Sequence, residues 1–427
     1  SRLASPDLTW ETSDQYTLGA DISLFDGRLN VTADAYLIKT RDLLLTVQVA
    51  SQTGYTNYFA NAGRTTNKGW ELTVESRNIV RPKFQWSTTL TLSRNRQMVD
   101  DIASEDFVTA YSSPSSSGTT YMMYGYKKGY TLNALWGFRY GGVWHNQEEV
   151  ERNKITKAYA SASGNTFKPG YARYQDINHD GALNSDDLVY LGSADPDLYG
   201  GIQNTFNIHN FTFSFFFNYS IGGKIYNVAE LWMGNGSPYT NQYKYMQNSW
   251  HPVRNPNSNL PMAGSYDALP SDRLVHDASY LRLKNISASY TFDMRKVTKN
   301  RLRDIRVSVS GENLYLWKKY NGFDPDVSTS SSNSALRRVD IGAYPKPPDH
   351  YFQPPDQILT AKTMKSYSFL KKYLLAATAT AALLFSACDL DEHPTSFVGP
   401  KEYYKTRAQC LAGLNACYIP INSIYDY

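Results

Sequence analysis

Residues 176–187 carry oxygen-bearing side chains at the spacing of a calcium-binding loop. Aspartate, asparagine and aspartate occupy loop positions 1, 3 and 5, glycine occupies position 6, and aspartate occupies position 12. In such loops the glycine allows a sharp turn, position 7 supplies a backbone carbonyl, and the acid at position 12 completes the coordination shell. The sequence therefore predicts an all-oxygen site that favours Ca²⁺, with the ligands Asp176, Asn178, Asp180, Ala182, Asn184 and Asp187.

The alternative interpretation of this segment is a surface turn, rich in Asn, Asp and Gly, that holds no ion. Aspartate at position 12 is shorter than the usual glutamate, so bidentate coordination there requires a tighter loop. The flanking residues lack the paired helical patterns of a calcium sensor. We therefore expect a bound ion to stiffen a long loop and to take no part in catalysis.

The only cysteines are Cys388, Cys410 and Cys417, all near the C-terminus. The residues before Cys388 can therefore form neither a disulfide framework nor a cysteine-based metal site. Cys410 and Cys417 follow a helical pattern that separates them by about 10 Å, too far for a disulfide. We expect both to be buried small residues.

Residues 364–388 have the pattern of a lipoprotein export signal. Met364 is followed by lysines, then by the uncharged residues 373–385, and then by Ser-Ala-Cys and an acidic run. The uncharged stretch is shorter than the roughly 20 residues that a membrane-spanning helix needs, and a buried helix is the other alternative. We predict that Cys388 is the lipid-modified cysteine of this signal.

Motifs of common enzymes are missing from the sequence. It contains no G-x-S-x-G, no H-E-x-x-H and no phosphate-binding glycine loop, and its histidines are scattered. Carboxylate pairs such as Glu148-Glu149 are typical of solvated loops, and a net charge of +4 is too small to indicate nucleic-acid binding. We predict that the chain is not an enzyme.

Four tryptophans lie in predicted loops: Trp136, Trp144, Trp232 and Trp250. Their rings could stack on sugars or cap peptides. The alternative, which we favour for each taken alone, is packing within the loops or a place in an interfacial girdle.

Strand patterns dominate residues 14–313 and must position these groups. Apolar and polar side chains alternate along residues 16–24 and 29–37, and Asp26-Gly27 between them predicts a two-residue hairpin. Further strands are predicted near residues 70–74, 86–92, 202–208 and 305–309. In residues 280–292 the apolar phase slips, which indicates a bulge or an extension beyond the membrane.

The aromatic content favours a membrane β-barrel. Aromatics make up 14% of the chain, which has 34 tyrosines. One face of residues 211–219 is entirely aromatic, which suits lipid better than a protein core. Strands that alternate between lipid and lumen keep the mean hydropathy low. A Tyr-rich secreted β-sandwich is the alternative.

Connection lengths support the barrel. Short turns are predicted at residues 26–27, 80–82 and 209–210, and long excursions at 41–66, 95–130, 142–198 and 222–279. Outer-membrane barrels alternate short periplasmic turns with long extracellular loops. We therefore predict an all-β fold: the C-terminal part of a large antiparallel transmembrane β-barrel of about ten strands, followed by a short helical segment.

The strand pattern stops near residue 344. Residues 344–357 contain five prolines, so we expect no closing strand there. A one-base shift in the codons for residues 347–359 permits Pro-Arg-Thr-Ile-Ile-Phe-Ser-Leu-Gln-Ile-Lys, then Phe or Tyr, then a stop. That string alternates and ends in an aromatic residue, as a last barrel strand should.

Because an export signal must lead a chain, its position at residue 364 suggests two genes read as one. The hypothesis is a frameshift just before or within the codons for Pro347 and Pro348. The first residues contain neither a methionine nor a signal peptide, so we expect the true start to be missing.

Several segments resemble SusC/RagA-type TonB-dependent transporters. They are Asn-Ala-Gly-Arg-Thr-Thr-Asn-Lys-Gly-Trp-Glu at 61–71, Ser-Tyr-Leu-Arg-Leu-Lys-Asn-Ile at 279–286, Glu-Asn-Leu at 312–314, Tyr-Asn-Gly-Phe-Asp-Pro-Asp at 320–326, and Tyr-Pro at 344–345. The 176–187 loop also occurs in that family, and the resemblance covers most of residues 1–350. The tail, with Cys388 and Pro-Lys-Glu-Tyr-Tyr-Lys-Thr at 400–406, resembles a SusD/RagB-type lipoprotein. Genes of these two families usually lie side by side in Bacteroidetes-like genomes.

The resemblance implies a barrel of about 22 strands with an N-terminal plug, in the outer membrane of a Gram-negative cell. It also implies energy from the TonB complex, a SusD-like lipoprotein lid, and an oligosaccharide or peptide as substrate. We expect TonB-dependent import of oligosaccharides or other large nutrients as the function. Without a plug, a TonB-contact segment or a closing strand, we expect the chain as written not to transport.

Two other functions stay open: a surface-exposed SusD-like glycan-binding lipoprotein, and a secreted calcium-loop β adhesin. The predicted organisation is a partial barrel (1–350), an aberrant junction (351–363), the lipoprotein signal (364–388) and the start of a SusD-like helical domain (389–427).

Overall fold

The computed structural model divides the chain into two units, Ser1–Asp356 and Gln357–Tyr427. The residues it describes all lie in the first: 3–48, 52, 54–55, 57–102, 108–114, 120–153, 155–157, 167–234, 241–265, 269–295, 303–327, 337–343 and 349–353. The predicted export signal, Cys388, Cys410 and Cys417 lie outside the described residues.

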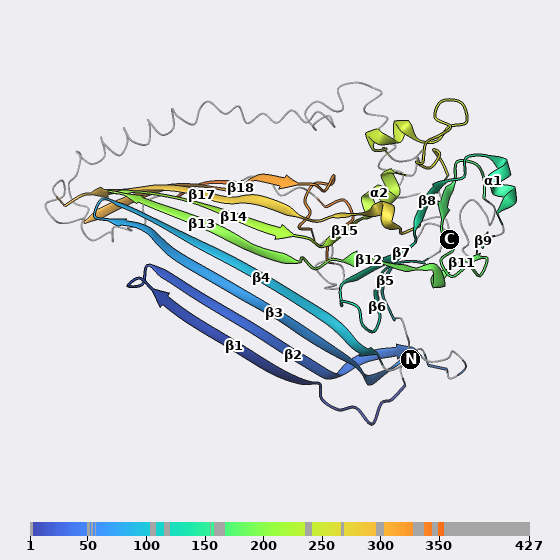
Figure 1. Ribbon diagram of the computed structural model, residues 1–427, viewed down its shortest axis with the longest axis horizontal. Coiled ribbons are helices and arrows are strands. Elements are labelled where there is room, and N and C mark those ends of the chain that lie inside the picture. The colour runs from blue at the N-terminus through green and yellow to red at the C-terminus, as the bar shows by residue number, and fades with distance from the viewer. Residues whose placement is uncertain are drawn as a thin grey trace, which may run out of the picture. The chain divides into compact units, whose positions relative to one another are not determined.

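One antiparallel sheet of nine strands forms the larger part of the first unit (Figure 1). We call it the strand wall. Its order is β1 (Thr12–Leu24), β2 (Leu29–Gln48), β3 (Asn57–Arg81), β4 (Phe84–Ile102), β13 (Leu198–Ile208), β14 (Phe211–Ile221), β17 (Tyr280–Asp293), β18 (Asp304–Lys318) and β20 (Asp349–Gln353). Among the described residues the wall is open, with β1 and β20 at its edges.

Short and long connections alternate, as predicted. Residues 25–28, 82–83, 209–210 and 294–303 connect strands at one end of the wall, and residues 49–56, 103–197, 222–279 and 319–348 connect them at the other. The last three of these are the long ones, whereas 49–56 is shorter than 294–303 and does not fit the alternation. Two details of the prediction are wrong. Most of residues 41–66 belongs to β2 and β3, and the excursions at 95–130 and 142–198 are parts of one connection. Among the described residues the wall has nine strands, close to the predicted number of about ten.

The first hairpin has the predicted turn residues but a longer loop. Leu24 pairs with Leu29, so four residues and not two form the connection. Asp26 and Gly27 have φ of 54° and 76°, the left-handed region that Asp and Gly tolerate best.

The phase slip in residues 280–292 is a β-bulge, as predicted. The register of β14 against β17 shifts between Phe216 and Phe217. The register of β18 against β17 shifts between Leu283 and Asn285. Against β14, Lys284 is an extra residue, which moves the apolar phase of β17 by one position; against β18, the extra residue lies in β18, where two residues stand opposite Lys284.

Residues 344–357, for which we predicted no closing strand, do contain a short edge strand. Asp349–Gln353 forms β20, an edge strand that pairs with β18 from Glu312 to Ser308. Prolines flank this segment but do not occur inside it. Each of its residues can therefore donate a backbone N–H, and prolines are tolerated at the ends of an edge strand.

The wall has one apolar and one polar face, because its register keeps side chains of one kind in rows across the strands. An apolar row runs through eight strands: Ile22, Val31, Val74, Leu90, Ile202, Phe217, Leu283 and Tyr315. A mostly polar row runs across the other face: Asn30, Glu75, Thr89, Gln203, Phe216, Asn285, Glu312 and Asp349.

The three longest connections, 103–197, 222–279 and 319–348, build a second substructure, which we call the loop lobe. Its elements are short: β5 (Val108–Pro114), β6 (Thr120–Tyr126), β7 (Ala134–Gly137), β8 (Tyr140–Val143), α1 (Gln147–Arg152), β9 (Thr156–Lys157), β10 (Ala172–Tyr174), β11 (Ala182–Leu183), η2 (Ser185–Asp187), β12 (Val189–Ser193), β15 (Lys224–Asn227), α2 (Val228–Met233), η3 (Lys244–Asn248), η4 (Asp272–Leu274), β16 (Val275–Asp277) and β19 (Val339–Asp340). They pair into small sheets, of which β16-β15-β19 joins the second connection to the third.

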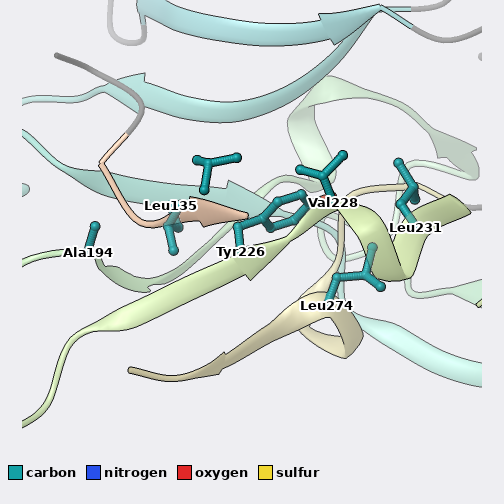
Figure 2. Packing of buried hydrophobic residues seen from close by; sticks show 7 residues of the cluster. Leu135, Ala194, Tyr226, Val228, Leu231 and Leu274 are labelled. Carbon is teal, nitrogen blue, oxygen red and sulfur yellow. The ribbon is translucent and has the colours of Figure 1, made fainter. Parts of the chain in front are cut away.

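A buried hydrophobic core holds the loop lobe together (Figure 2). Leu135 comes from the first long connection, Tyr226 and Leu274 come from the second, and Val339 comes from the third. Leu135, Leu274 and Val339 are fully buried. The three connections therefore share one core and are not separate loops.

Candidate functional site

The apolar face of the wall carries a continuous aromatic cluster. Phe213, Phe215 and Phe217 follow one another along β14 with ring centroids 5.7 to 6.1 Å apart. Phe206 on β13 lies 6.3 and 6.1 Å from the first two of these rings. Elsewhere on this face Leu18 is 78% exposed. A contiguous apolar surface of this extent requires a non-aqueous neighbour, and the hydrocarbon of a membrane supplies one.

Among the described residues, no helix is long and apolar enough to cross a membrane.

Packing on the polar face explains the second glycine of the 61–71 motif, Gly69. A Cβ on Gly69 would lie 2.4 Å from the hydroxyl of Tyr36 on the neighbouring strand, so only glycine leaves room for that ring. In this position the Tyr36 hydroxyl donates a hydrogen bond to Asn95 Oδ1 at 3.1 Å. Asn61 of the same motif, on β3, donates to the carbonyl of Thr9, which precedes β1, and to that of Asp42 on β2.

A buried ion pair links the wall to the loop lobe. Arg282 on β17 donates to Asp324 Oδ1 at 2.7 Å, and both side chains are only 5% exposed. Asp324 lies in the 319–348 connection, where its Oδ1 also accepts the backbone N–H of Asp326. Both residues belong to segments that resemble the transporter family, but a contact across 42 residues cannot be seen in either segment alone.

A second buried carboxylate organises the centre of the lobe. Glu230 on α2 contacts His276 Nε2 at 2.6 Å and accepts a hydrogen bond from the Tyr245 hydroxyl at 2.7 Å. Burial raises the pKa of Glu230, but the hydrogen bonds from His276 and Tyr245 outweigh it and hold the pKa below its usual value. This network was not predicted, because no spacing in the sequence brings its members together.

The predicted calcium loop folds around its own backbone. Asp176 Oδ2 accepts the N–H of Gly181 at 2.9 Å. Asp187 is fully buried and accepts the N–H groups of Ile177 and Asn184 at 2.7 and 2.9 Å. Position 1 of the segment is thereby tied to position 6, and position 12 to positions 2 and 9.

The remaining predicted ligands also lie in this loop. Asp180 Oδ1 accepts the N–H of Ala182 at 2.8 Å, and this bond lowers the pKa of Asp180. Asn184 Oδ1 accepts the N–H of Asp186 at 2.7 Å. Asn178 Oδ1 accepts the N–H of the aspartate at position 5 at 3.1 Å.

One observation bears on whether an ion fits the loop. Asp176 Oδ1 is buried and has no hydrogen-bond partner, which is costly unless a cation or water is present. In the described part of the chain, no three His, Cys, Asp or Glu side chains converge as a metal-binding group. The predicted set instead mixes carboxylates with amide and backbone oxygens, as calcium loops do, so its donor chemistry fits Ca²⁺.

The loop tryptophans pack inside the lobe. Trp136, Trp144 and Trp250 are 4%, 6% and 6% exposed, so the packing interpretation is confirmed for these three. Trp136 Nε1 also donates to the carbonyl of Gly125 at 3.0 Å. The side chain of Trp232 lies outside the described residues.

Comparisons with known proteins agree with this architecture. Residues 2–204 match the family described as "TonB dependent receptor-like, beta-barrel". The "TonB-dependent receptor P26" of Formosa agariphila is 32% identical over 354 residues, which are 81% of this chain and 34% of that protein. The "TonB-dependent receptor SusC" of Bacteroides thetaiotaomicron is 23% identical over 345 residues, which are 80% of this chain and 31% of that protein.

Among solved structures, the "RagAB peptide transporter" has a TM-score of 0.63 at 22% identity. The match covers 82% of this chain and 35% of that one, and at this identity it supports the fold alone. The chain thus spans about a third of the length of the relatives that it matches.

Proposed function

We propose that this chain, which carries a TonB-dependent receptor β-barrel segment homologous to SusC and RagA-like transporters, is part of an importer of oligosaccharides or other large nutrients. Proteins of this family lie in the outer membrane. The observation that carries the proposal is the two-faced wall, whose apolar face suits lipid and whose polar face suits a water-filled passage. The loop lobe at the long-connection end would contact substrate first.

The proposed partners are a SusD-like lipoprotein lid over the lobe and the TonB complex, reached through parts of the importer outside this chain. A SusD-like glycan-binding lipoprotein is the weaker alternative, because the described wall and lobe both precede the lipoprotein-like tail. A secreted calcium-loop adhesin is weaker still, because a soluble protein would not expose the Phe213–Phe217 face to water.

Growth of the source bacterium tests the import function. We expect deletion of the gene to abolish growth on one class of oligosaccharide or peptide that is too large for porins. Deletion of its TonB gene should give the same defect without adding to it. Wild-type growth of the gene deletion on every oligosaccharide and peptide of such a panel would contradict the proposal.

We also propose that residues 176–187 hold a structural Ca²⁺. Asp176, Asn178, Asp180, Asn184 and Asp187 would supply side-chain oxygens, and Ala182 would supply its carbonyl. The ion would neutralise clustered carboxylates and fix the loop. The buried, unpartnered Asp176 Oδ1 supports this assignment.

For the junction we propose that the natural closing strand is encoded in the adjacent reading frame. In the register of β20, positions 350 and 352 lie opposite Gly311 and Val309, in phase with the apolar face. The alternative string places Ile, Phe, Leu, Ile and an aromatic residue at positions 350, 352, 354, 356 and 358. The apolar residues at these five positions would therefore all face lipid. The reading frame of the sequence as given instead places prolines at positions 354 and 355.

The DNA across codons 340–370 tests the junction. Sequencing the source genome should reveal one base fewer at the codons for Pro347 and Pro348, a restored strand, and a stop before Met364. The lipoprotein with Cys388 would then be a separate protein. An unbroken frame in the genome, with both prolines encoded, would overturn the proposal.

A further inference from the structure

A cavity of about 340 Å³ lies in the loop lobe beside η3. Its volume is near the lower end of the roughly 300–1,000 Å³ typical of ligand pockets. It is distinct from the calcium loop and from the Arg282–Asp324 pair. The described residues that line it come from the second long connection: Gln242, Tyr243, Lys244, Met246, Gln247, Ser249 and Ala263.

Tyr243, the aromatic residue that lines this cavity, is held in place by contacts with its neighbours. Tyr243 donates its backbone N–H to the carbonyl of Met233 at 3.0 Å, and its ring stacks on Tyr245 at 5.6 Å and 10°. The hydroxyl of Tyr245 is in turn bonded to the buried Glu230. A ring fixed before a ligand arrives loses little conformational entropy on binding.

The polar groups around the cavity suit hydroxyl groups. The amides of Gln242 and Gln247 and the hydroxyl of Ser249 can each donate and accept. Lys244 brings a positive charge, and none of the described residues that line the cavity is a carboxylate. This set matches an uncharged or acidic ligand rich in hydroxyls and disfavours a cationic one.

The backbone beside the cavity does not suit an extended peptide. Peptides commonly bind by adding a strand to a free sheet edge. Here the lining segment η3 is a 3₁₀ turn and not a strand, and two N–H groups of this segment are already used: Met246 donates to the Tyr243 carbonyl at 2.9 Å, and Ser249 donates to the Met246 carbonyl at 3.0 Å. Recognition must therefore come from side chains and ring faces.

We propose that this cavity is a subsite for one sugar ring of an oligosaccharide, stacked on Tyr243 and held by Gln247 and Ser249. The inference rests on the proposed import function and names carbohydrate as its substrate class. It places the first contact with substrate on the loop lobe and not inside the wall.

Saturation-transfer NMR on the full chain in detergent micelles tests the subsite. The probes are maltohexaose, xylohexaose, pentagalacturonic acid and a chitosan hexamer. We expect transfer to neutral or acidic sugars and not to chitosan. The Tyr243→Ala and Gln247→Ala variants should each bind about tenfold more weakly.

The matched control is Phe323→Ala, which removes an aromatic ring that is 63% exposed in the lobe and does not line the cavity. It should bind as the wild type does, and near-UV circular dichroism should show that all variants keep the lobe fold. Equal sugar binding by Tyr243→Ala and the wild type would overturn the subsite. So would a lack of transfer to every sugar at about 10 mM, or transfer to peptides alone. Sugar binding without a growth defect in the gene deletion would contradict the import function but not the subsite.

Discussion

The strand wall and the loop lobe are built from one chain but keep their shape in different ways. In the wall, neighbouring strands follow one another in chain order, either directly or after one of the three longest connections, and few side chains are fully buried. In the lobe, strands of two to seven residues pack around a core from three distant connections. The apolar face of the wall lacks a covering layer of its own among the described residues, whereas the lobe has a buried core. The two regions should therefore respond differently to the same kind of damage.

The largest effect should come from breaking the ion pair that joins the two regions. Asp324→Ala leaves Arg282 charged, buried and unpaired, which typically costs about 3–5 kcal/mol. We expect the lobe to unfold at much lower urea concentration, as followed by near-UV circular dichroism. The control is Glu148→Ala, which removes the exposed ion pair with Arg152 and should cost less than about 1 kcal/mol. Equal midpoints for the two variants would show that the pair does not hold the lobe.

A charge on the apolar face should damage the wall alone. Leu90 lies in the apolar row of β4, and its neighbour Thr89 lies on the polar face. Leu90→Arg should cost about 2–4 kcal/mol in a bilayer, because arginine would face hydrocarbon, and Thr89→Arg should cost far less. Heat-modifiable migration of the barrel from the complete gene, titrated with urea in lipid vesicles, measures the difference. If both substitutions cost the same, the apolar face does not meet lipid.

Removal of calcium should affect the lobe and spare the wall. At about 100-fold excess over its dissociation constant, an ion stabilises the folded state by about 2.7 kcal/mol. Chelation or Asp176→Asn should lower the urea midpoint of the lobe accordingly, and calorimetry should show that Asp176→Asn no longer binds Ca²⁺. The matched control, Asp186→Asn, changes an exposed residue of the same segment that is not a predicted ligand. Unchanged midpoints in chelator would contradict the calcium assignment.

The smallest effect should appear in the acid response of the lobe. Because the folded protein lowers the pKa of Glu230, ionised Glu230 contributes stability above its unfolded pKa of about 4.3, and this is lost as pH falls through the folded pKa. Glu230→Gln should therefore cost about 1–2 kcal/mol at pH 7, and the gap from the wild type should shrink on acidification. Urea midpoints between pH 7 and 3 measure the gap. A constant gap would show that the ionised form adds no stability.

The comparison also explains what the sequence could predict. Alternation along residues 211–219, the turn at Asp26-Gly27 and the slip after Leu283 are local signals, and each corresponds to an element of the wall. The calcium loop is local as well, so its internal geometry follows from its spacing. Whether an ion occupies it stays a prediction.

The lobe was largely hidden because its contacts are not local. Nothing near Glu230 in sequence indicates that His276 completes its hydrogen bonds, and nothing near Leu135 indicates that Val339 packs in the same core. Short strands such as β19 are too brief for alternation to appear. β20 was missed for the opposite reason, because flanking prolines obscured five residues that can pair.

The shared core of Leu135, Tyr226, Leu274 and Val339 also constrains how such receptors diverge. A connection that packs alone could be exchanged by recombination or grafting without disturbing its neighbours. Here, a connection that is transplanted alone would lack the core residues that the other two connections contribute. The three connections should therefore be inherited as a coordinated set, and laboratory chimaeras should fold only when all three connections are exchanged together.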